Sequence, residues 1–395
     1  MKIPTSLLLP GTLLFAASCH PAAPSARTFD PLRMRDYCVA KTRATLRVRA
    51  DADSMPRHIL RGEKEWNRVS VHDWTSGFWP GILWYAYECS GDTVLQRAAE
   101  GATSALAQLL EVPAESHDLG FMFFCSYGQA FRLTGDPACK EMVLRAADSL
   151  ATLYHPRVGT ILSWPGMRAR MGWPHNTIID NMMNLELLFW AAKHGGSPRL
   201  AEIAVRHAET SMRTLIRPDY SVYHVGVFDT TDGHFIKGVT VQGYSDSSMW
   251  ARGQAWAIYG YTVAYRETGK AEFLQTARGL ADRFLARLPA DLIPYWDFDD
   301  PSIPAAPRDA AAAAIAASAL LELGQHVTGP AAAQRYRAAA IALLSRLSTP
   351  EYLGGETCQA FLRHATGHKP AGLEIDASLI YADYYYLEAL MRLTR

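Results

Sequence analysis

Apolar residues recur at helical spacing along almost the whole chain, and this periodicity restricts its fold more than any other feature. Glycine-containing breaks such as 133–136 and 267–270 are typical of helix ends that lead into the next helix. An alternating, extended pattern is expected only over 221–240, as a hairpin around the turn at 232–233. The predicted helices span 30–50, 77–90, 93–110, 119–134, 137–153, 177–194, 198–215, 248–267, 271–288, 309–324, 330–347 and 376–394.

Helices joined by alternating short and long connections predict an all-α fold, in which six helical hairpins close into an (α/α)6 barrel with a small β-hairpin insertion. Long connections usually carry function, so we expect the functional residues near them. They are 154–176, 217–247, 289–308 and 348–375. An open helical solenoid is the alternative architecture, although the chain shows no fixed repeat motif. No linker-like segment divides residues 30–395, which predicts a single domain there.

The first nineteen residues predict a targeting segment that is not part of the fold. A short apolar run follows Met1-Lys2, and small residues lead directly to Cys19. The pattern resembles a bacterial lipoprotein signal with Cys19 as the lipidated residue, and an ordinary secretory signal is the alternative. Residues 20–29 then form a tether. We expect an exported protein, periplasmic or anchored in the outer membrane of a Gram-negative bacterium, whose one possible membrane contact is a lipid on Cys19.

The composition and the spacing of charged residues and cysteines show no sign of nucleic-acid binding, of a disulfide framework or of a metal site. About half of the 395 residues are apolar, which allows a large core. The 39 basic residues equal the 39 acidic ones, so the charge balance gives no sign of nucleic-acid binding. The cysteines after Cys19 show no pairing framework, and no group of histidine, cysteine and acidic residues has the spacing of metal ligands. We therefore expect no metal and no cofactor.

The segment 238–256 has the composition of a binding site for an acidic sugar. A loop rich in glycine and hydroxyl groups leads into a predicted helix that carries Arg252 and Trp256. These two residues are four positions apart and share one helix face. A guanidinium pairs with a carboxylate through two hydrogen bonds, and an indole supplies a flat apolar wall beside it.

Two aspartates are candidates for acid–base chemistry. Asp180 lies in a predicted helix that is apolar on nearly every side, where burial would raise its pKa towards the range of a proton donor. Asn184 shares its face and is expected to orient it. A structural carboxylate paired with a buried arginine is the alternative. Asp118 precedes a predicted helix, and taken alone it is better explained as a helix N-cap than as a functional carboxylate. His224, in the expected hairpin, has either a structural or a binding role.

Taken together, these segments resemble the unsaturated glucuronyl hydrolases, glycoside hydrolase family 88. The resemblance covers nearly all of 30–394, in order. Its most specific motifs contain His117-Asp118, Asp180-Asn181 and Tyr223-His224. The matching segments are 73–81, 117–121, 179–185, 223–224, 238–246, 250–256 and 381–390.

The resemblance implies a glycosidase that removes the 4,5-unsaturated uronic acid from the non-reducing end of lyase-generated glycosaminoglycan oligosaccharides, such as those from chondroitin, hyaluronan or heparin. In this family, water adds across the vinyl ether double bond. Carried over, Asp180 protonates C4 and then takes a proton from the water that attacks C5, while Asp118 stabilises the developing charge. The uronate subsite maps onto His224, Gln242, Arg252 and Trp256, with Gly238 and Thr240 on the same loop.

Two departures from the family pattern concern the substrate. Some members have histidine where this chain has Val241. The segment 363–370, with Thr366, His368 and Lys369, matches the place where members contact the next sugar and any sulfate, but a solvated loop is the alternative. Two other functions stay open. An unsaturated rhamnogalacturonyl hydrolase shares the barrel and the chemistry, and a lipid-anchored glycan-binding protein would lack catalysis.

Overall fold

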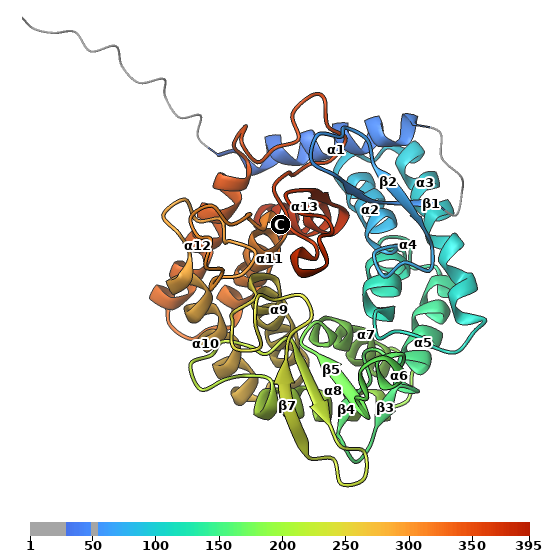
Figure 1. Ribbon diagram of the computed structural model, residues 1–395. Helices are drawn as coiled ribbons and strands as arrows, with labels where there is room; N and C mark the ends of the chain where they lie inside the picture. The colour runs from blue at the N-terminus through green and yellow to red at the C-terminus, as the bar shows by residue number, and fades with distance from the viewer. Residues whose placement is uncertain (1–28, 49–53) are drawn as a thin grey trace, which may run out of the picture.

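The computed structural model describes residues 29–48 and 54–395 and confirms the (α/α)6 barrel. Two concentric rings of helices surround one axis (Figure 1). The inner ring consists of α2 (Phe78–Ser90), the π-helical η2 (Gly120–Gly128) continued by α4 (Gln129–Thr134), α7 (Asn181–Lys193), α9 (Ala251–Thr268), α11 (Ala310–His326) and α13 (Ile380–Thr394). The outer ring consists of α1 (Pro31–Arg47), α3 (Thr93–Ser104), α5 (Pro137–Ala151), α8 (Arg199–Thr214), α10 (Ala271–Arg287) and α12 (Pro330–Leu347).

Residue type separates the two rings. The inner helix α9 is buried continuously from Ala251 to Ala264, and α11 begins with a run of buried alanines that lets neighbouring helices approach closely. The outer helix α8 buries one face, which includes Leu200, Ile203 and His207, and exposes the opposite one. Helices that are apolar all round therefore lie inside, and amphipathic helices surround them.

A three-stranded sheet stands beside the mouth of the barrel (Figure 1). The predicted hairpin is confirmed as β6 (Val225–Phe228) and β7 (Phe235–Val239), which pair antiparallel. The third strand, β5 (His175–Ile178), corrects the predicted helix 177–194, because α7 begins only at Asn181. The β-branched run 177–179 favours an extended chain, and pairing of β5 with β6 satisfies its backbone. Asp180 consequently lies directly before the N-terminal residue of α7 and not within the helix.

Further short strands lie in segments for which the sequence predicted no extended structure. They are β1 (Ser54–Ile59), β2 (Asn67–Ser70) and β8 (Ser378–Leu379) in one sheet, and β3 (Tyr154–His155) with β4 (Thr160–Ile161) in another. The predicted helix 93–110 is also divided, into α3 and the 3-10 helix η1 (Ala105–Leu110). Two further short helices, α6 (Met167–Met171) and η3 (Lys369–Ala371), lie in the long connections. The expectation that extended structure is confined to 221–240 is therefore wrong.

All inner helices run in the same direction, because inner and outer helices alternate along the chain. Their N-terminal ends, with partial positive charge, therefore meet at one mouth of the barrel, and their C-terminal ends meet at the other. Asp118, Asp180 and Arg252 lie at or just before such N-terminal ends.

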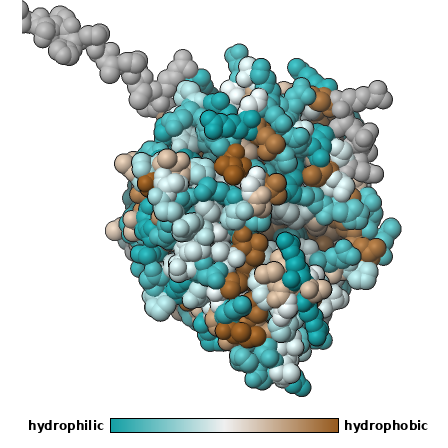
Figure 2. Space-filling model, viewed as in Figure 1, coloured by the Kyte–Doolittle hydropathy of each residue, from teal (hydrophilic) through white to brown (hydrophobic). Residues whose placement is uncertain are grey.

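In the view of Figure 2, apolar side chains form a band across the middle of the surface and hydrophilic residues surround it.

Candidate active site

Asp180 lies between β5 and α7, where a strand passes directly into an inner helix. Its side chain is buried, and among the described residues no group hydrogen-bonds to Oδ2. Burial raises the pKa of this carboxyl to about 7; the charge of Arg252 opposes the rise and that of Asp118 adds to it. A carboxyl with such a pKa can both give and take a proton near neutral pH.

Asp118 immediately precedes η2, but its carboxylate does not cap that helix. Ser116 Oγ donates to Oδ2 at 2.5 Å, and His117 Nε2 lies 3.5 Å from Oδ1. No backbone N–H of the described helices donates to its oxygens, which excludes the N-cap interpretation. The residue is 8% exposed, so the carboxylate is largely buried at the end of the barrel where the inner helices begin.

Asn184 supports the Asp118 segment instead of Asp180, which corrects the sequence expectation. Its Oδ1 accepts the backbone N–H of Phe121 at 2.9 Å, and its Nδ2 lies 3.3 Å from His117 Nδ1. An amide N–H₂ is a donor, so His117 Nδ1 is the acceptor and Nε2 carries the proton that points towards Asp118. One amide thus links α7 to the start of η2.

His224 presents a neutral N–H to the Asp180 carboxyl. The backbone N–H groups of Val241 and Gln242 both donate to Nδ1, at 3.0 and 3.1 Å, so the ring proton is on Nε2. This nitrogen lies 3.8 Å from Asp180 Oδ2. Burial, and then the charge of Arg252, hold the pKa of His224 well below its ordinary value. The histidine is therefore a fixed hydrogen-bond donor and not a cation at neutral pH.

The loop after β7 is shaped by Gly238 and Thr240. A Cβ on Gly238 would lie 2.4 Å from the Tyr223 ring, so only glycine fits against that ring. Thr240 Oγ1 accepts the backbone N–H of Gly243 at 2.8 Å. Both residues thereby place Gln242, whose backbone holds His224. The direct sugar contacts expected of Gly238 and Thr240 stay predictions.

Arg252 is almost completely buried in the first turn of α9. Its Nη1 donates to Asp309 Oδ2 at 3.0 Å and to the carbonyl of Thr366, and its Nη2 donates to the carbonyl of Gly367 at 2.6 Å and reaches Gln242 Oε1 at 3.5 Å. Four protein acceptors thus occupy the guanidinium. Its charge acts on Asp180 and His224, whereas the expected pairing with a substrate carboxylate stays a prediction.

Trp256, one turn further along α9, completes the floor of the site. It is fully buried, and its rings contact those of Phe121 and Tyr385 with 5.2 Å between centroids in each case. Within the described part of the chain, its indole N–H makes no hydrogen bond of regular geometry. The same side chain interacts with the Asp180 carboxyl and lowers its pKa. The indole N–H is therefore a second donor at the proton-active group.

The structure brings together a carboxyl oxygen and two N–H donors that are all buried without a partner: Asp180 Oδ2, His224 Nε2 and Trp256 Nε1. Buried polar atoms of native proteins are almost always hydrogen-bonded, so such a group marks the place of a polar ligand. The charges of Asp118 and Arg252 both act on Asp180. This arrangement can exchange a proton with a bound molecule and stabilise charge that develops on it.

The segment 363–370 is tied to the barrel and is not a solvated loop. Thr366 is 1% exposed and its hydroxyl donates to the carbonyl of Arg308. His368 Nε2 lies 3.0 Å from the carbonyl oxygen of Val241, and Lys369 forms an ion pair with Asp300 at 2.9 Å. These contacts connect the segment to the loop that holds His224. Whether these side chains also accept a sulfated sugar stays a prediction.

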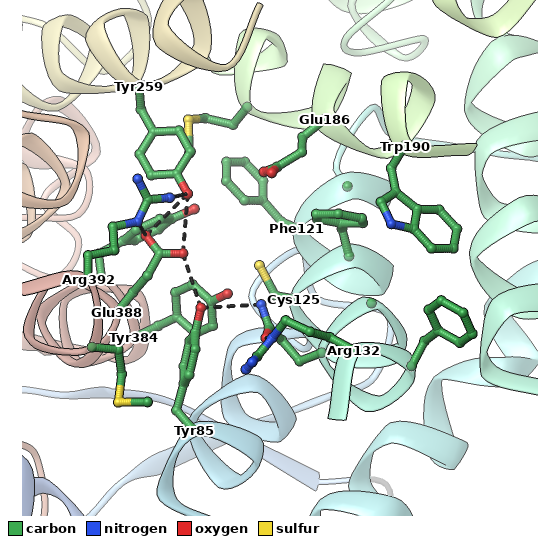
Figure 3. Close-up of a pocket in the computed structure, with 18 of the residues that line it drawn as sticks. Tyr85, Phe121, Cys125, Arg132, Glu186, Trp190, Tyr259, Tyr384, Glu388 and Arg392 are labelled. Atoms are coloured by element: carbon green, nitrogen blue, oxygen red, sulfur yellow. Dashed lines mark hydrogen bonds and ion pairs between the residues drawn. The ribbon is translucent and has the colours of Figure 1, made fainter. Parts of the chain in front are cut away.

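A cavity of about 480 Å³ lies at the opposite end of the barrel and shares none of the candidate site residues. Figure 3 shows Arg392 and Glu388 pointing into it beside Tyr259, with Trp190 across from them. Arginines at this end complement the partial negative charge of the inner helices' C-termini. Its lining also includes the free thiol of Cys125. The cavity does not contain the proton-active carboxyl.

Two contributors to the site were missed by the sequence prediction. Asp309 accepts hydrogen bonds from backbone N–H groups at the start of α11 and from Arg252. Tyr381 lies beneath the guanidinium, with 5.4 Å between the Arg252 carbon and the ring centroid. A signal existed for Asp309, because it stands directly before an alanine run, as an N-cap does. Only the tertiary structure places it against Arg252.

Comparison with known proteins identifies the family to which the chain belongs. The family model described as Glycosyl Hydrolase Family 88 matches residues 45–347. An unsaturated glucuronyl hydrolase from Formosa agariphila is 41% identical over 86% of this chain and 85% of its own length. An unsaturated chondroitin disaccharide hydrolase from Streptococcus pyogenes is 34% identical over 92% of each chain.

Solved structures give the same result. The crystal structure of an unsaturated glucuronyl hydrolase specific for heparin superimposes with a TM-score of 0.86 at 40% identity, covering 92% of this chain and 96% of that one. The unsaturated glucuronyl hydrolase of Bacillus sp. GL1 also gives 0.86, at 35% identity, and covers 92% and 97% of the two chains. Sequence and fold therefore agree, and the chain belongs to glycosyl hydrolase family 88, as an unsaturated glucuronyl hydrolase.

Proposed function

We propose that this protein removes the 4,5-unsaturated uronic acid from the non-reducing end of lyase-generated glycosaminoglycan oligosaccharides. The relatives support this substrate class, since they include chondroitin disaccharide hydrolases and a hydrolase specific for heparin. One observation of this chain carries the chemistry: the Asp180 carboxyl has a pKa of about 7, His224 Nε2 lies 3.8 Å from its Oδ2, and the Trp256 side chain interacts with the same carboxyl.

The reaction is the hydration of the vinyl ether. Asp180 donates its proton to C4, and positive charge develops at C5 and the ring oxygen, where the Asp118 carboxylate stabilises it. Asp180, now ionised, accepts a proton from the water that attacks C5. The resulting hemiketal opens and releases the neighbouring sugar. Asp180 ends the cycle protonated, and one water has been consumed.

The subsite residues bind and orient the unsaturated ring in this scheme. His224 Nε2 and Trp256 Nε1 supply hydrogen bonds beside Asp180, and the backbone of Gln242 keeps the histidine in the donor tautomer. Arg252 contributes positive charge for the uronate carboxylate. Gly238 and Thr240 hold the loop in place.

The test follows the ultraviolet absorbance of the conjugated double bond in lyase-generated disaccharides from hyaluronan, chondroitin sulfate, heparin and rhamnogalacturonan. Loss of absorbance on the glycosaminoglycan set supports the proposal and ranks the substrates. Turnover of the rhamnogalacturonan disaccharide alone identifies the pectin-directed alternative, and binding without turnover identifies a glycan-binding protein. Reaction in deuterium oxide should place one deuterium at C4, whereas direct displacement at the glycosidic bond would not.

We also propose that the protein is exported and lipidated at Cys19. This residue and the preceding signal lie outside the described residues, and the support comes from their sequence alone. No helix in the described ranges is long and apolar enough to cross a membrane. Mass spectrometry of the mature N-terminus from a Gram-negative host should show a lipid-modified Cys19, and Cys19→Ser should abolish the modification. An unmodified N-terminus at a nearby residue would instead identify an ordinary secretory signal.

A further inference from the structure

Asp309 is a fully buried carboxylate that joins three parts of the molecule. Its Oδ1 accepts the N–H groups of Ala311 at 3.0 Å and Ala312 at 3.4 Å, at the start of α11, and that of Thr366 at 3.5 Å. Its Oδ2 accepts Nη1 of Arg252 at 3.0 Å. Every one of these partners is a donor. Burial raises the pKa of Asp309, but the charge of Arg252 and the backbone N–H groups oppose that rise and favour the ionised form, which makes a buried ion pair with the guanidinium.

This ion pair is linked to the proton-active group through Gln242 and His224. Arg252 Nη2 lies 3.5 Å from Gln242 Oε1, the backbone N–H of Gln242 donates to His224 Nδ1, and His224 Nε2 lies 3.8 Å from Asp180 Oδ2. Arg252 acts on Asp180 and on His224 as a nearby positive charge, and the carboxylate of Asp118 acts on Asp180 with the opposite sign. Asp309 is the acidic partner of the guanidinium, so it limits the positive charge that Asp180 experiences. Other titratable groups surround Asp180 and the Arg252–Asp309 ion pair. They are His117 and Asp118 before η2, His224 before β6, His368 in the long connection and Tyr381 on α13.

We infer that Asp309 is a positioning residue of the active site: it fixes the Arg252 guanidinium next to Asp180 and sets the net charge around the proton donor. The inference rests on the proposed role of Asp180. It also explains why a residue that caps α11 bonds to the backbone of Thr366, since the carbonyls of Thr366 and Gly367 accept from the same guanidinium.

The test is the pH profile of kcat/KM for Asp309→Asn. The amide keeps an acceptor for the helix N-terminus but loses the negative charge, so the charge of Arg252 is no longer balanced. Ionised Asp180 is then favoured, its pKa falls, and the descending limb moves from about pH 7 to a lower value by about one unit. Asp92→Asn is a matched control, because Asp92 also caps a helix, α3, and pairs with an arginine, Arg43, on the outer ring. Its profile should not move.

A second measurement reports the same shift without turnover. The difference in unfolding free energy between the parent and its Asp180→Asn variant changes with pH as Asp180 ionises. The midpoint of this change lies halfway between the pKa values of Asp180 in the unfolded and the folded protein, so it should be lower in the Asp309→Asn background, by half of the fall in the folded-state pKa. Asp309→Ser keeps a capping hydroxyl and removes the charge, so it replaces the asparagine variant if that one does not fold.

The outcomes separate the inference from the proposed function. Asp309→Asn could instead lower kcat/KM equally at every pH, leaving the descending limb of the pH profile and the midpoint of the stability difference unchanged. That result would show that Asp309 is only structural and would overturn the inference. If the wild-type protein turned over no unsaturated disaccharide, the proposed function would fail, while a moved midpoint would still support the placement of the charge.

Discussion

At the scale of single residues, the site depends on buried groups held in one protonation state by their neighbours. Two backbone N–H groups hold His224 in the tautomer that donates from Nε2. The charges of Asp118 and Arg252 act on Asp180 with opposite signs, but its burial is the larger effect. The sequence located these residues by motif, whereas their protonation states follow only from contacts between distant segments.

Removal of the acid should abolish turnover without abolishing binding. Asp180→Asn keeps the shape of the side chain but cannot give a proton to C4. We expect kcat to fall by at least about two orders of magnitude, the usual size of a general-acid contribution, while the dissociation constant for an unsaturated disaccharide changes little. Stopped assays and calorimetry measure the two quantities. A near-normal rate would exclude Asp180 as the acid.

The same substitution should stabilise the fold at alkaline pH. The carboxyl titrates at about 7 in the folded protein and at about 3.9 when unfolded, so between these values the folded state binds more protons and stability falls as pH rises. Asp180→Asn removes this loss, which is about 1.4 kcal/mol for each pKa unit. Its advantage in urea unfolding should be absent at pH 4 and largest above pH 7.

Asp92→Asn should change the free energy of unfolding in the opposite direction. Backbone and Arg43 hydrogen bonds lower the pKa of this half-buried N-cap carboxylate, so its contribution to stability is present above the ordinary pKa and is lost in acid. That variant should therefore be less stable than the wild type at neutral pH. A gain in stability for both variants would contradict the assignment of the Asp180 effect to burial.

At the scale of elements, close approaches of backbone decide where the catalytic segments lie. Gly120 begins η2, two residues after Asp118, and faces α7: a Cβ there would lie 2.6 Å from both Cα and Oδ1 of Asn184. The same amide supports the segment that contains Asp118. The packing of η2 on α7 therefore sets the relative position of the two carboxylates.

Gly120→Ala should accordingly cost both stability and activity. Overpacking at this contact should destabilise the protein by about 1–3 kcal/mol and lower kcat/KM, because η2 must move with Asp118. Gly101→Ala is the control: Gly101 is exposed within α3 and has open space around a Cβ, so alanine should stabilise by about 1 kcal/mol without changing activity. Equal behaviour of the two variants in thermal unfolding would contradict the packing argument.

At the scale of the whole molecule, the barrel contains several histidines that stay neutral when the solution becomes acidic. His207 on α8 is fully buried, and burial, with the nearby His117 and His175, lowers its pKa to about 3. Burial also lowers the pKa of His175 to about 3. In the unfolded chain these groups take up protons near pH 6.5, so folding stability must fall as pH drops from about 6.5 towards 3.

His207→Asn should reduce this sensitivity. The asparagine oxygen can still accept the backbone N–H of Ile161, which His207 Nδ1 accepts at 3.0 Å. Between about pH 4 and pH 6 the unfolding free energy should change less steeply than in the wild type, by about 1.4 kcal/mol per pH unit. Urea unfolding at a series of pH values measures both slopes. Parallel slopes would show that His207 does not stay neutral in the folded protein.

The sequence by itself determined the helical pattern, the barrel that follows from it, and the residues whose motifs carry the chemistry. The helices depend on local spacing, namely apolar residues at helical period and glycines at turns, and a separation of four residues places Arg252 and Trp256 on one face. The roles proposed for Asp118, His224 and the loop after them came from the resemblance to a known family. The position of Asp180 directly before the first residue of α7 was not predicted, because the β-branched residues Thr177 and Ile178 form a strand only when β6 is available to pair with them.

Only the tertiary structure decided which groups meet. Asp309 pairs with Arg252 across 57 positions, and Asn184 reaches the backbone of Phe121 across 63. Such contacts leave no periodic signal, because they depend on how the helices close into a ring and not on spacing along one element. The pKa of Asp180 was decided in the same way, since desolvation is a property of the assembled barrel and not of the residue.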